Sequence, residues 1–356
     1  MNKTVVFTGG GTAGHVYPGL SVAEALSKKD NGIRIVWIGS SKGMEAEIVR
    51  EAGLEFIGIP SGKLRRYFSV KNFFDLFRIA AGLIKAYRVM RKLKPDLVFS
   101  KGGFVSVPPV TAAGLLKIPV FSHESDLTPG LATRINSRFS EKILVSYEQT
   151  LKFFPSGNAV VAGNPVRAAI YRADGVNGRK LADAGDKKII LVIGGSQGAL
   201  QINLLIQELA RELVKDFVII HQMGSFSFKQ STLEGYMTRD FIRAELPDFI
   251  AASDLIISRA GASTLWETAS LGKPAILIPL GSGSSRGDQG KNAEVFREAG
   301  ASVVLDGDLK AQRLKEEIYH LMNDDELRRK MGEAALRFVK GNPSDKISEI
   351  IKERLG

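Results

Sequence analysis

Short unbroken runs of apolar residues recur along this chain, and longer segments with a helical mixture of apolar and polar residues separate them. Such runs are typical of parallel strands that are buried on both faces and covered by helices. In the first half the pattern predicts strands at 3–8, 33–38, 55–59, 96–100, 118–122, 142–145 and 159–161. In the second half it predicts strands at 188–193, 216–221, 254–258, 275–279 and 301–305. The predicted fold class is therefore α/β, with two doubly wound parallel-sheet domains in tandem.

The predicted helices lie between these strands, for example over 18–29, 43–52, 70–92 and 104–116. Pro165 marks the boundary between the domains, because proline prevents a continuing strand from donating a hydrogen bond there. We therefore predict a first domain over 1–163 and a second over 164–341. The remaining segment, 342–356, contains a predicted helix, and analogy with other two-domain folds predicts that it returns to the first domain.

Two glycine-rich loops, each between an apolar strand and a helix, are the most informative motifs. The first reads G-G-G-T-A-G-H over 9–15, and the second reads G-G-S-Q-G-A over 194–199. Glycine lets a ligand approach main-chain N–H groups, and a helix N-terminus adds free donors and a positive dipole end. Each loop is a candidate phosphate site, and Ser196 and Gln197 in the second suit a diphosphate. The alternative is a purely structural turn.

Two familiar nucleotide sites fit the first loop poorly. Gly9, Gly11 and Gly14 match the pattern G-x-G-x-x-G, but the second strand ends in G-S-S over 39–41, without the acidic residue that holds a ribose in dinucleotide sites. Neither loop is followed by the Gly-Lys-Ser/Thr of a P-loop.

His15 directly follows the first loop, where a phosphate or sugar would lie. An imidazole titrates near working pH, and a helix N-terminus keeps it neutral, as a general base requires. His15 is therefore a candidate base, and the alternative is a histidine that only caps or packs.

Two further strand-to-helix turns in the second half suit a nucleotide sugar. The first reads S-R-A-G-A-S-T-L-W-E over 258–267, and its small residues let a ligand approach while the Glu267 carboxylate can accept two ribose hydrogen bonds. The second reads D-Q-G-K-N over 288–292 and offers amide and carboxylate groups to sugar hydroxyls. The alternatives are an acidic residue that complements the helix dipole and an ordinary helix cap.

Composition narrows the chemistry. The chain has 356 residues, of which 44% are hydrophobic, enough for two cores. It has no cysteine, which excludes disulfides and thiol chemistry, and its four scattered histidines predict no metal site. We expect neither a signal peptide before the first strand nor a spanning helix of ~20 apolar residues, which fits a cytoplasmic compartment.

Positive charge is concentrated in one region. The net charge is +11, and residues 61–94 alone hold ten Lys or Arg and one acid, Asp75, which gives +9. The predicted helix 70–92 lies in this region. Basic residues recur along one stripe of it: Lys71, Arg78, Lys85 and Lys92. Aromatic residues lie among them: Phe73, Phe74 and Phe77. This composition suggests a surface for an anionic membrane, and the alternative is a core helix with one solvated face.

Seven short motifs occur in order along the chain. They read G-G-T-A-G-H at 10–15, K-G-G-F-V-S-V-P at 101–108, H-E-S-D at 123–126, G-N-P-V-R at 163–167, G-G-S-Q-G-A at 194–199, S-R-A-G at 258–261 and D-Q-G-K-N-A at 288–293. Single motifs are modest evidence, but seven in register are strong. Over nearly its whole length the chain resembles the MurG family, the peptidoglycan N-acetylglucosaminyltransferases.

The resemblance implies a GT-B fold, in which two Rossmann-like domains face each other across a cleft. It implies inverting transfer of GlcNAc from UDP-GlcNAc to the C4 hydroxyl of the MurNAc of undecaprenyl-linked lipid I, which gives lipid II, without a cofactor or metal. The first domain would face the acceptor and the membrane, and the second would bind UDP-GlcNAc. The expected location is the cytoplasmic face of the bacterial cell membrane, as a peripheral protein on an anionic surface, with no nucleic-acid partner.

The resemblance also assigns residues by position. The implied donor contacts are Arg167, Ser196, Ile242, Ala262, Ser263, Thr264, Leu265, Glu267 and Gln289. Thr12, Ala13 and Gly14 would approach the sugar from the first domain. His15 is the expected general base and Asp126 the reserve, because Asp126 occupies a position where the family commonly has Asn.

Three other functions remain open at this point. A related transferase glycosylates diacylglycerol, and a UDP-GlcNAc 2-epimerase shares the two-domain architecture. The third alternative is a non-enzymatic membrane-docking partner, although such a partner can dispense with a donor site and both loops are intact here.

Overall fold

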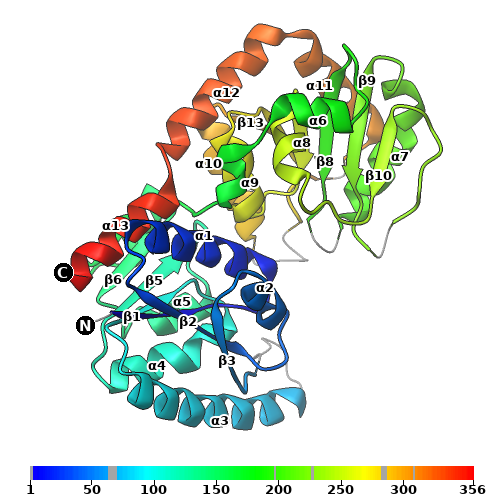
Figure 1. The fold of residues 1–356 in the computed structure, drawn as a ribbon. Coiled ribbons are helices and arrows are strands. Elements are labelled where there is room, and N and C mark those ends of the chain that lie inside the picture. Colours follow the sequence, from blue (N-terminus) through cyan, green and yellow to red (C-terminus); the bar gives the residue numbers. More distant parts are fainter. Residues whose placement is uncertain (1–2, 63–69, 196–197, 226–227, 282–286, 308) are drawn as a thin grey trace. The chain divides into compact units, whose positions relative to one another are not determined.

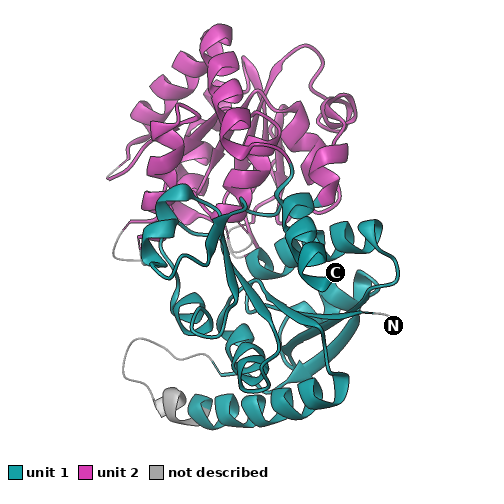
Figure 2. Cartoon of the chain, turned by 90° about the vertical axis from the view of Figure 1, so that its left-hand side faces the viewer, with its two compact units in different colours: residues 1–167, 342–356 teal, residues 168–341 magenta. Residues whose placement is uncertain are grey.

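The computed structural model describes residues 3–62, 70–195, 198–225, 228–281, 287–307 and 309–356, and for 70–74 the backbone alone. The chain divides into two compact units, which Figure 2 shows in different colours. Unit 1 comprises residues 1–167 and 342–356, and unit 2 comprises 168–341. The division falls four residues after the expected boundary at Gly163, because Pro165 and Val166 are buried in unit 1 and the Val166 carbonyl accepts a hydrogen bond from the Ser344 hydroxyl.

Unit 1 contains a seven-stranded sheet with the order β3-β2-β1-β4-β5-β6-β7 (Figure 1). All neighbouring strands are parallel, and their bounds are β1 Thr4–Thr8, β2 Arg34–Ser40, β3 Glu55–Ile59, β4 Leu97–Ser100, β5 Val120–Glu124, β6 Lys142–Val145 and β7 Ala159–Val161. The helices are α1 Ala13–Lys29, α2 Glu45–Glu51, α3 Val70–Leu93, α4 Val107–Leu115, α5 Leu131–Asn136 and α13 Pro343–Leu355, with 3-10 turns at Phe104–Ser106 and Glu148–Phe153.

Apolar side chains cover both faces of this sheet, as its continuous apolar strands predict. On one face α1 and α13 pack together, and Ile347 and Ile351 of α13 join Val22 and Leu26 of α1 in a single core. On the other face α3 and α4 pack together over a second core, to which α3 contributes Met90. The last helix is therefore part of unit 1, although unit 2 precedes it in the sequence.

Unit 2 contains a six-stranded parallel sheet with the order β10-β9-β8-β11-β12-β13. The strands are β8 Lys188–Ile193, β9 Phe217–Gln222, β10 Tyr236–Arg239, β11 Leu255–Ser258, β12 Ala275–Leu277 and β13 Ser302–Val304. The helices are α6 Gly175–Leu181, α7 Leu200–Leu213, α8 Leu246–Ala252, α9 Ala262–Ser270, α10 Asp288–Glu298, α11 Ala311–Asn323 and α12 Asp325–Val339, with a 3-10 turn at Ala168–Arg172.

Two elements differ from the sequence prediction. Helix α1 begins at Ala13 rather than residue 18, and Pro18 lies inside it, because the glycines and proline of this segment weaken its helical pattern. Strand β10 was not predicted, because it is a four-residue edge strand without a continuous apolar run.

Candidate active site

In unit 1 the first glycine loop lies at the point where the strand order reverses. Strand β1 has β2 on one side and β4 on the other, and Thr8 at its end pairs with Ser100 at the end of β4. Ligands of open α/β sheets bind at such points, outside the carboxyl ends of the strands. Gly11 has a φ of +84°, which favours glycine, and α1 begins two residues later. The N–H groups of the first turn, which include those of Ala13 and Gly14, therefore form a potential anion site.

His15 is held in place by the residue that precedes the helix. The Thr12 hydroxyl lies 2.8 Å from His15 Nδ1 and makes no side-chain cap to the backbone. The His15 backbone N–H donates to the Thr12 carbonyl oxygen at 3.1 Å. The imidazole is half-buried at the start of α1, so its orientation is fixed while part of the ring remains accessible.

Asp126 lies in the loop that follows β5, and a buried carboxylate organises this loop. The Glu124 carboxylate accepts hydrogen bonds from the backbone N–H groups of Asp126 and Gly130, both at 3.0 Å. Burial raises the pKa of Glu124, and the nearby Asp126 carboxylate raises it further. The strands β4 and β5 are neighbours, so Asp126 and the turn after β4 emerge at the same edge of the sheet.

Sequence reasoning missed a cavity of about 630 Å³ in unit 1. Its lining residues are Gly11, Ser40, Ser41, Lys42, Gly43, Met44, Glu45, Pro60, Ser61, Asp75, Arg78 and Phe104. Glu45 is fully buried, and its carboxylate accepts hydrogen bonds from the N–H groups of Ser40 at 2.8 Å and Gly11 at 3.4 Å. Glu45 of α2, five residues after the end of β2, therefore supports the first glycine loop.

In unit 2 the second glycine loop occupies the equivalent reversal point, between β8 and β11. Ser196 and Gln197 lie outside the described residues. Gly198 has a φ of +82°, and a Cβ atom there would lie 2.2 Å from the Met223 carbonyl oxygen, so only glycine fits. Helix α7 follows directly, which places a helix N-terminus after this loop.

Gln222, which sequence reasoning also missed, connects the second loop to Ile242. Its buried side chain donates to the Gly195 carbonyl oxygen at 3.3 Å and accepts from the Ile242 N–H at 2.9 Å. Ile242 is itself buried, near the carboxyl ends of β9 and β10. The predicted donor contact at Ile242 therefore lies at the same sheet edge as the second loop.

Helix α9 places the predicted nucleotide residues after β11. It begins at Ala262, so Ser263 and Thr264 lie in its first turn, where N–H groups are free of intrahelical partners. Leu265 is buried, and Glu267 is only 8% exposed, one turn further along. A carboxylate in such a desolvated place forms stronger hydrogen bonds than one in water.

The remaining predicted donor residues lie in two places. The Gln289 side chain accepts a hydrogen bond from the Leu280 N–H at 3.0 Å, which joins α10 to the segment after β12. Arg167 belongs to unit 1, where its guanidinium lies over the Tyr17 ring at 5.8 Å from the centroid. The structure therefore places Arg167 in unit 1, as it does Thr12, Ala13 and Gly14, whereas the other predicted donor contacts that it describes belong to unit 2.

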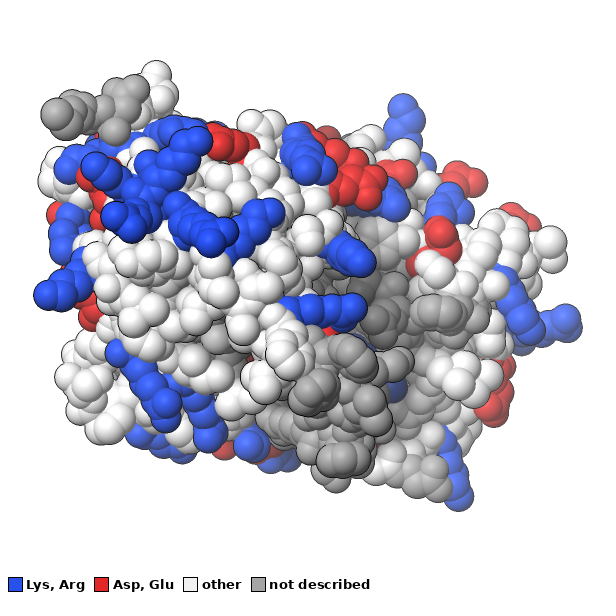
Figure 3. All heavy atoms as spheres, turned by 90° about the horizontal axis from the view of Figure 1, so that it is seen from below, with Lys and Arg blue, Asp and Glu red and all other residues white. Residues whose placement is uncertain are grey.

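Helix α3 carries exposed apolar and basic side chains together. Leu76, Phe77 and Ile84 are more than half exposed, as is Leu115 of α4. Seen from the side of α3, Lys and Arg side chains border a broad area with few charged groups (Figure 3). The side chains of Lys71, Phe73 and Phe74 lie outside the description, Lys85 is exposed, and Arg78 forms an ion pair at 3.2 Å with the buried Asp75.

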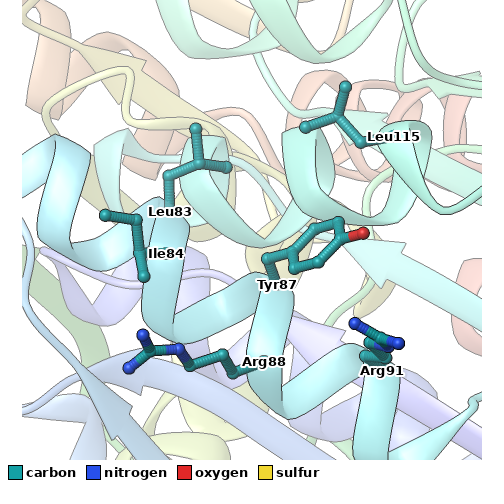
Figure 4. A pocket seen from close by; sticks show the side chains of 6 residues that line it. All are labelled: Leu83, Ile84, Tyr87, Arg88, Arg91 and Leu115. Carbon is teal, nitrogen blue, oxygen red and sulfur yellow. The ribbon is translucent and has the colours of Figure 1, made fainter.

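A cavity of about 320 Å³ lies between α3 and α4 (Figure 4). It is lined by Leu83, Ile84, Tyr87, Arg88, Arg91 and Leu115. Within the described residues, no helix is both long enough and apolar enough to cross a bilayer. No group of three metal-ligating side chains is found in the same part of the chain.

Known proteins match both units. Residues 5–145 match the Glycosyltransferase family 28 N-terminal domain, and residues 189–349 match the corresponding C-terminal domain. The UDP-N-acetylglucosamine–N-acetylmuramyl-(pentapeptide) pyrophosphoryl-undecaprenol N-acetylglucosamine transferase of Treponema denticola is 49% identical over 331 residues, which cover 86% of this chain and 84% of that protein. The transferase of the same name from Clostridium perfringens is 42% identical over 354 residues, 98% of each chain.

The chain belongs to the MurG family. A crystal structure of Acinetobacter baumannii MurG aligns with 99% of both chains at a TM-score of 0.75 and 25% identity. The predicted family, the α/β class and the GT-B fold are therefore confirmed. A Listeria monocytogenes protein titled a putative UDP-N-acetylglucosamine 2-epimerase aligns at a TM-score of 0.73 but only 14% identity, so it shares the fold alone. MurG relatives, rather than epimerases, are thus similar to this chain in sequence.

Proposed function

We propose that this MurG-family chain transfers N-acetylglucosamine from UDP-GlcNAc to the C4 hydroxyl of the MurNAc of lipid I and so forms lipid II. One observation carries the proposal: relatives with this named activity are 42–49% identical over most of the chain. The two glycine loops at the strand-order reversals support it, because the reaction needs anion sites for two diphosphate-containing substrates.

Unit 2 is the proposed donor domain. The second glycine loop and the first turn of α9 both present N–H groups at one edge of its sheet, where a diphosphate is stabilised without a metal. Glu267 accepts the ribose hydroxyl hydrogen bonds, and Gln289 shapes the loop after β12. Ser196, Gln197 and Ile242 complete the proposed set.

Unit 1 is the proposed acceptor domain. His15 removes the proton from the C4 hydroxyl while that oxygen attacks the anomeric carbon of GlcNAc, and the bond from this carbon to UDP breaks in the same displacement. The configuration inverts, and UDP leaves with the electron pair. Support comes from the Thr12 hydroxyl, which fixes the imidazole, and from the 630 Å³ cavity beside the same loop. Asp126 is the reserve base.

The face of α3 is the proposed membrane contact. Phe77, Ile84 and Leu115 supply exposed apolar surface, and Arg88 and Arg91 supply positive charge around the cavity in Figure 4. Apolar groups beside Lys and Arg suit the headgroup boundary of an anionic bilayer. The proposed location is therefore the cytoplasmic face of the bacterial cell membrane, where lipid I and UDP-GlcNAc meet.

An acceptor competition tests the activity. Purified protein is incubated with UDP-GlcNAc and a lipid I analogue, diacylglycerol or no acceptor, and products are identified by mass spectrometry. The proposal expects one added N-acetylhexosamine on the lipid I analogue alone. Transfer to diacylglycerol, or formation of UDP-ManNAc without an acceptor, would instead support the two rival activities.

A further inference from the structure

Lys101 is a buried lysine that the proposed mechanism leaves without a role. It directly follows β4, and only 1% of it is exposed. Lysine is almost never fully buried unless its ammonium group is paired. Its backbone N–H donates to the Thr8 carbonyl oxygen at 2.8 Å, and its ammonium group donates to the Ser125 hydroxyl. The residue thus connects the end of β1 to the loop after β5.

Two carboxylates, those of Glu124 and Asp126, act electrostatically on this ammonium group. Burial lowers the pKa of Lys101 from 10.5 to about 8, and Glu124 and Asp126 limit the decrease because they favour the charged form. His123 also faces this region, and burial together with the Lys101 charge lowers its pKa well below the usual value. The ammonium group therefore offsets part of the negative charge of Glu124 and Asp126.

Lys101 also begins the turn that passes beside His15. Gly102 and Gly103 have φ values of +90° and +77°. A Cβ atom at Gly103 would lie 3.4 Å from His15 Nδ1, and one at Gly102 would lie 3.7 Å from His15 Cδ2. A Cβ atom at Gly9 would lie 3.1 Å from Lys101 Cβ. The lysine therefore packs against the first glycine loop on one side and bonds the Asp126 loop on the other.

We propose that Lys101 is a positioning residue for the acceptor: its ammonium group holds the Ser125–Asp126 loop against the His15 turn, so that the Asp126 carboxylate accepts a hydrogen bond from the sugar. The inference rests on the proposed function, since it assigns Asp126 to the same acceptor site. It gives the two candidate bases different roles, with His15 as the proton acceptor and Asp126 as an orienting group that depends on Lys101.

The first test is Lys101→Met, which keeps an unbranched apolar stem and removes the charge. The expected result is a loss of about tenfold or more in kcat/KM for a lipid I analogue, the size of one lost hydrogen bond to a charged group. The alkaline limb of the pH profile that deprotonation of Lys101 sets should be lost, because methionine carries no ammonium group. The UDP affinity, measured by calorimetry, should stay within about twofold, since Lys101 and the proposed UDP site belong to different units.

Lys152→Met is the matched control, because Lys152 is an exposed lysine of unit 1, and it should leave all three quantities unchanged. The double variant, which combines Lys101→Met with Asp126→Asn, should have a kcat/KM above that of Lys101→Met alone. It lacks the Asp126 carboxylate, whose charge is no longer offset once Lys101 is replaced. Parental acceptor kinetics and pH profile in Lys101→Met would overturn the proposal. An equal loss of UDP affinity would also overturn it, because it would indicate a general structural role.

Asp126→Asn alone provides an arm that does not depend on the folding of Lys101→Met. It removes a carboxylate that raises the Lys101 pKa, so the alkaline limb that Lys101 sets should move to lower pH. An alkaline limb that does not move refutes the coupling. Transfer by the unaltered protein is measured first, so that failure of the proposed function is distinguished from failure of the Lys101 assignment.

Discussion

Replacement of Glu267 by alanine should weaken UDP binding, because it removes the proposed hydrogen bonds to the ribose and no other contact to the donor. Hydrogen bonds to charged groups are worth about 1.5–3 kcal/mol each. Glu267 is 8% exposed, so little water competes with a ligand for its carboxylate. One such bond corresponds to an increase of about 10- to 150-fold in the UDP dissociation constant. Glu298→Ala is the control, because it removes an exposed carboxylate of the same unit and should leave UDP affinity unchanged.

The decisive assay compares UDP with its 2′-deoxy and 3′-deoxy analogues by calorimetry. With the parent protein, at least one of the two deoxy analogues should bind more weakly than UDP, by a factor similar to that of the Glu267→Ala substitution. In Glu267→Ala the same loss should have little further effect, because the partner of that hydroxyl is already absent. If both deoxy analogues are discriminated equally in the parent and the variant, Glu267 does not bind the ribose and the assignment is wrong.

Three further results are expected. His15→Ala should reduce kcat by about 10²–10⁴ with little change in UDP affinity, since a general base contributes that much; a parental kcat would exclude His15 as the base. Joint replacement of Lys85, Arg88 and Arg91 by glutamine should weaken binding to vesicles that contain anionic lipid by ~1 kcal/mol per charge, measured by co-sedimentation, with UDP affinity as control; parental sedimentation would refute the membrane face. Burial lowers the pKa of His221 to about 4, so between pH 6.5 and 4 the unfolded chain binds more protons than the folded chain. The free energy of unfolding, measured by urea melts, should therefore fall by about 2–3 kcal/mol as the pH drops over that range, and His221→Gln should reduce this decrease. Equal pH dependence in both proteins would contradict this.

The continuous apolar runs were sufficient to predict the two parallel sheets, because parallel strands buried on both faces leave that pattern in a sequence. The edge strand β10 has no such run, and its tyrosine is anchored by a hydrogen bond at 2.8 Å to His221 of the neighbouring strand. Its position therefore depends on a long-range contact that periodicity does not report.

The residues of the candidate site also fall into two groups, those that the sequence could locate and those that it could not. The glycine loops and Glu267 could be located because their roles depend on the turn or helix that contains them. Glu45, Lys101 and Gln222 could not, since each acts through a buried side chain on a loop from another part of the sequence. Lys101 stands within a recognised motif, but nothing in the motif indicates that its ammonium group is buried between two loops.

The linkage in the purified product tests the central claim most directly. The disaccharide formed from UDP-GlcNAc and a lipid I analogue is isolated, and NMR determines both its anomeric configuration and the substituted hydroxyl. We expect a single β1→4 linkage between GlcNAc and MurNAc: one inverting displacement gives the β configuration, and the proposed acceptor is the C4 hydroxyl. An α linkage, substitution at another hydroxyl, or no transfer to the lipid I analogue would contradict it.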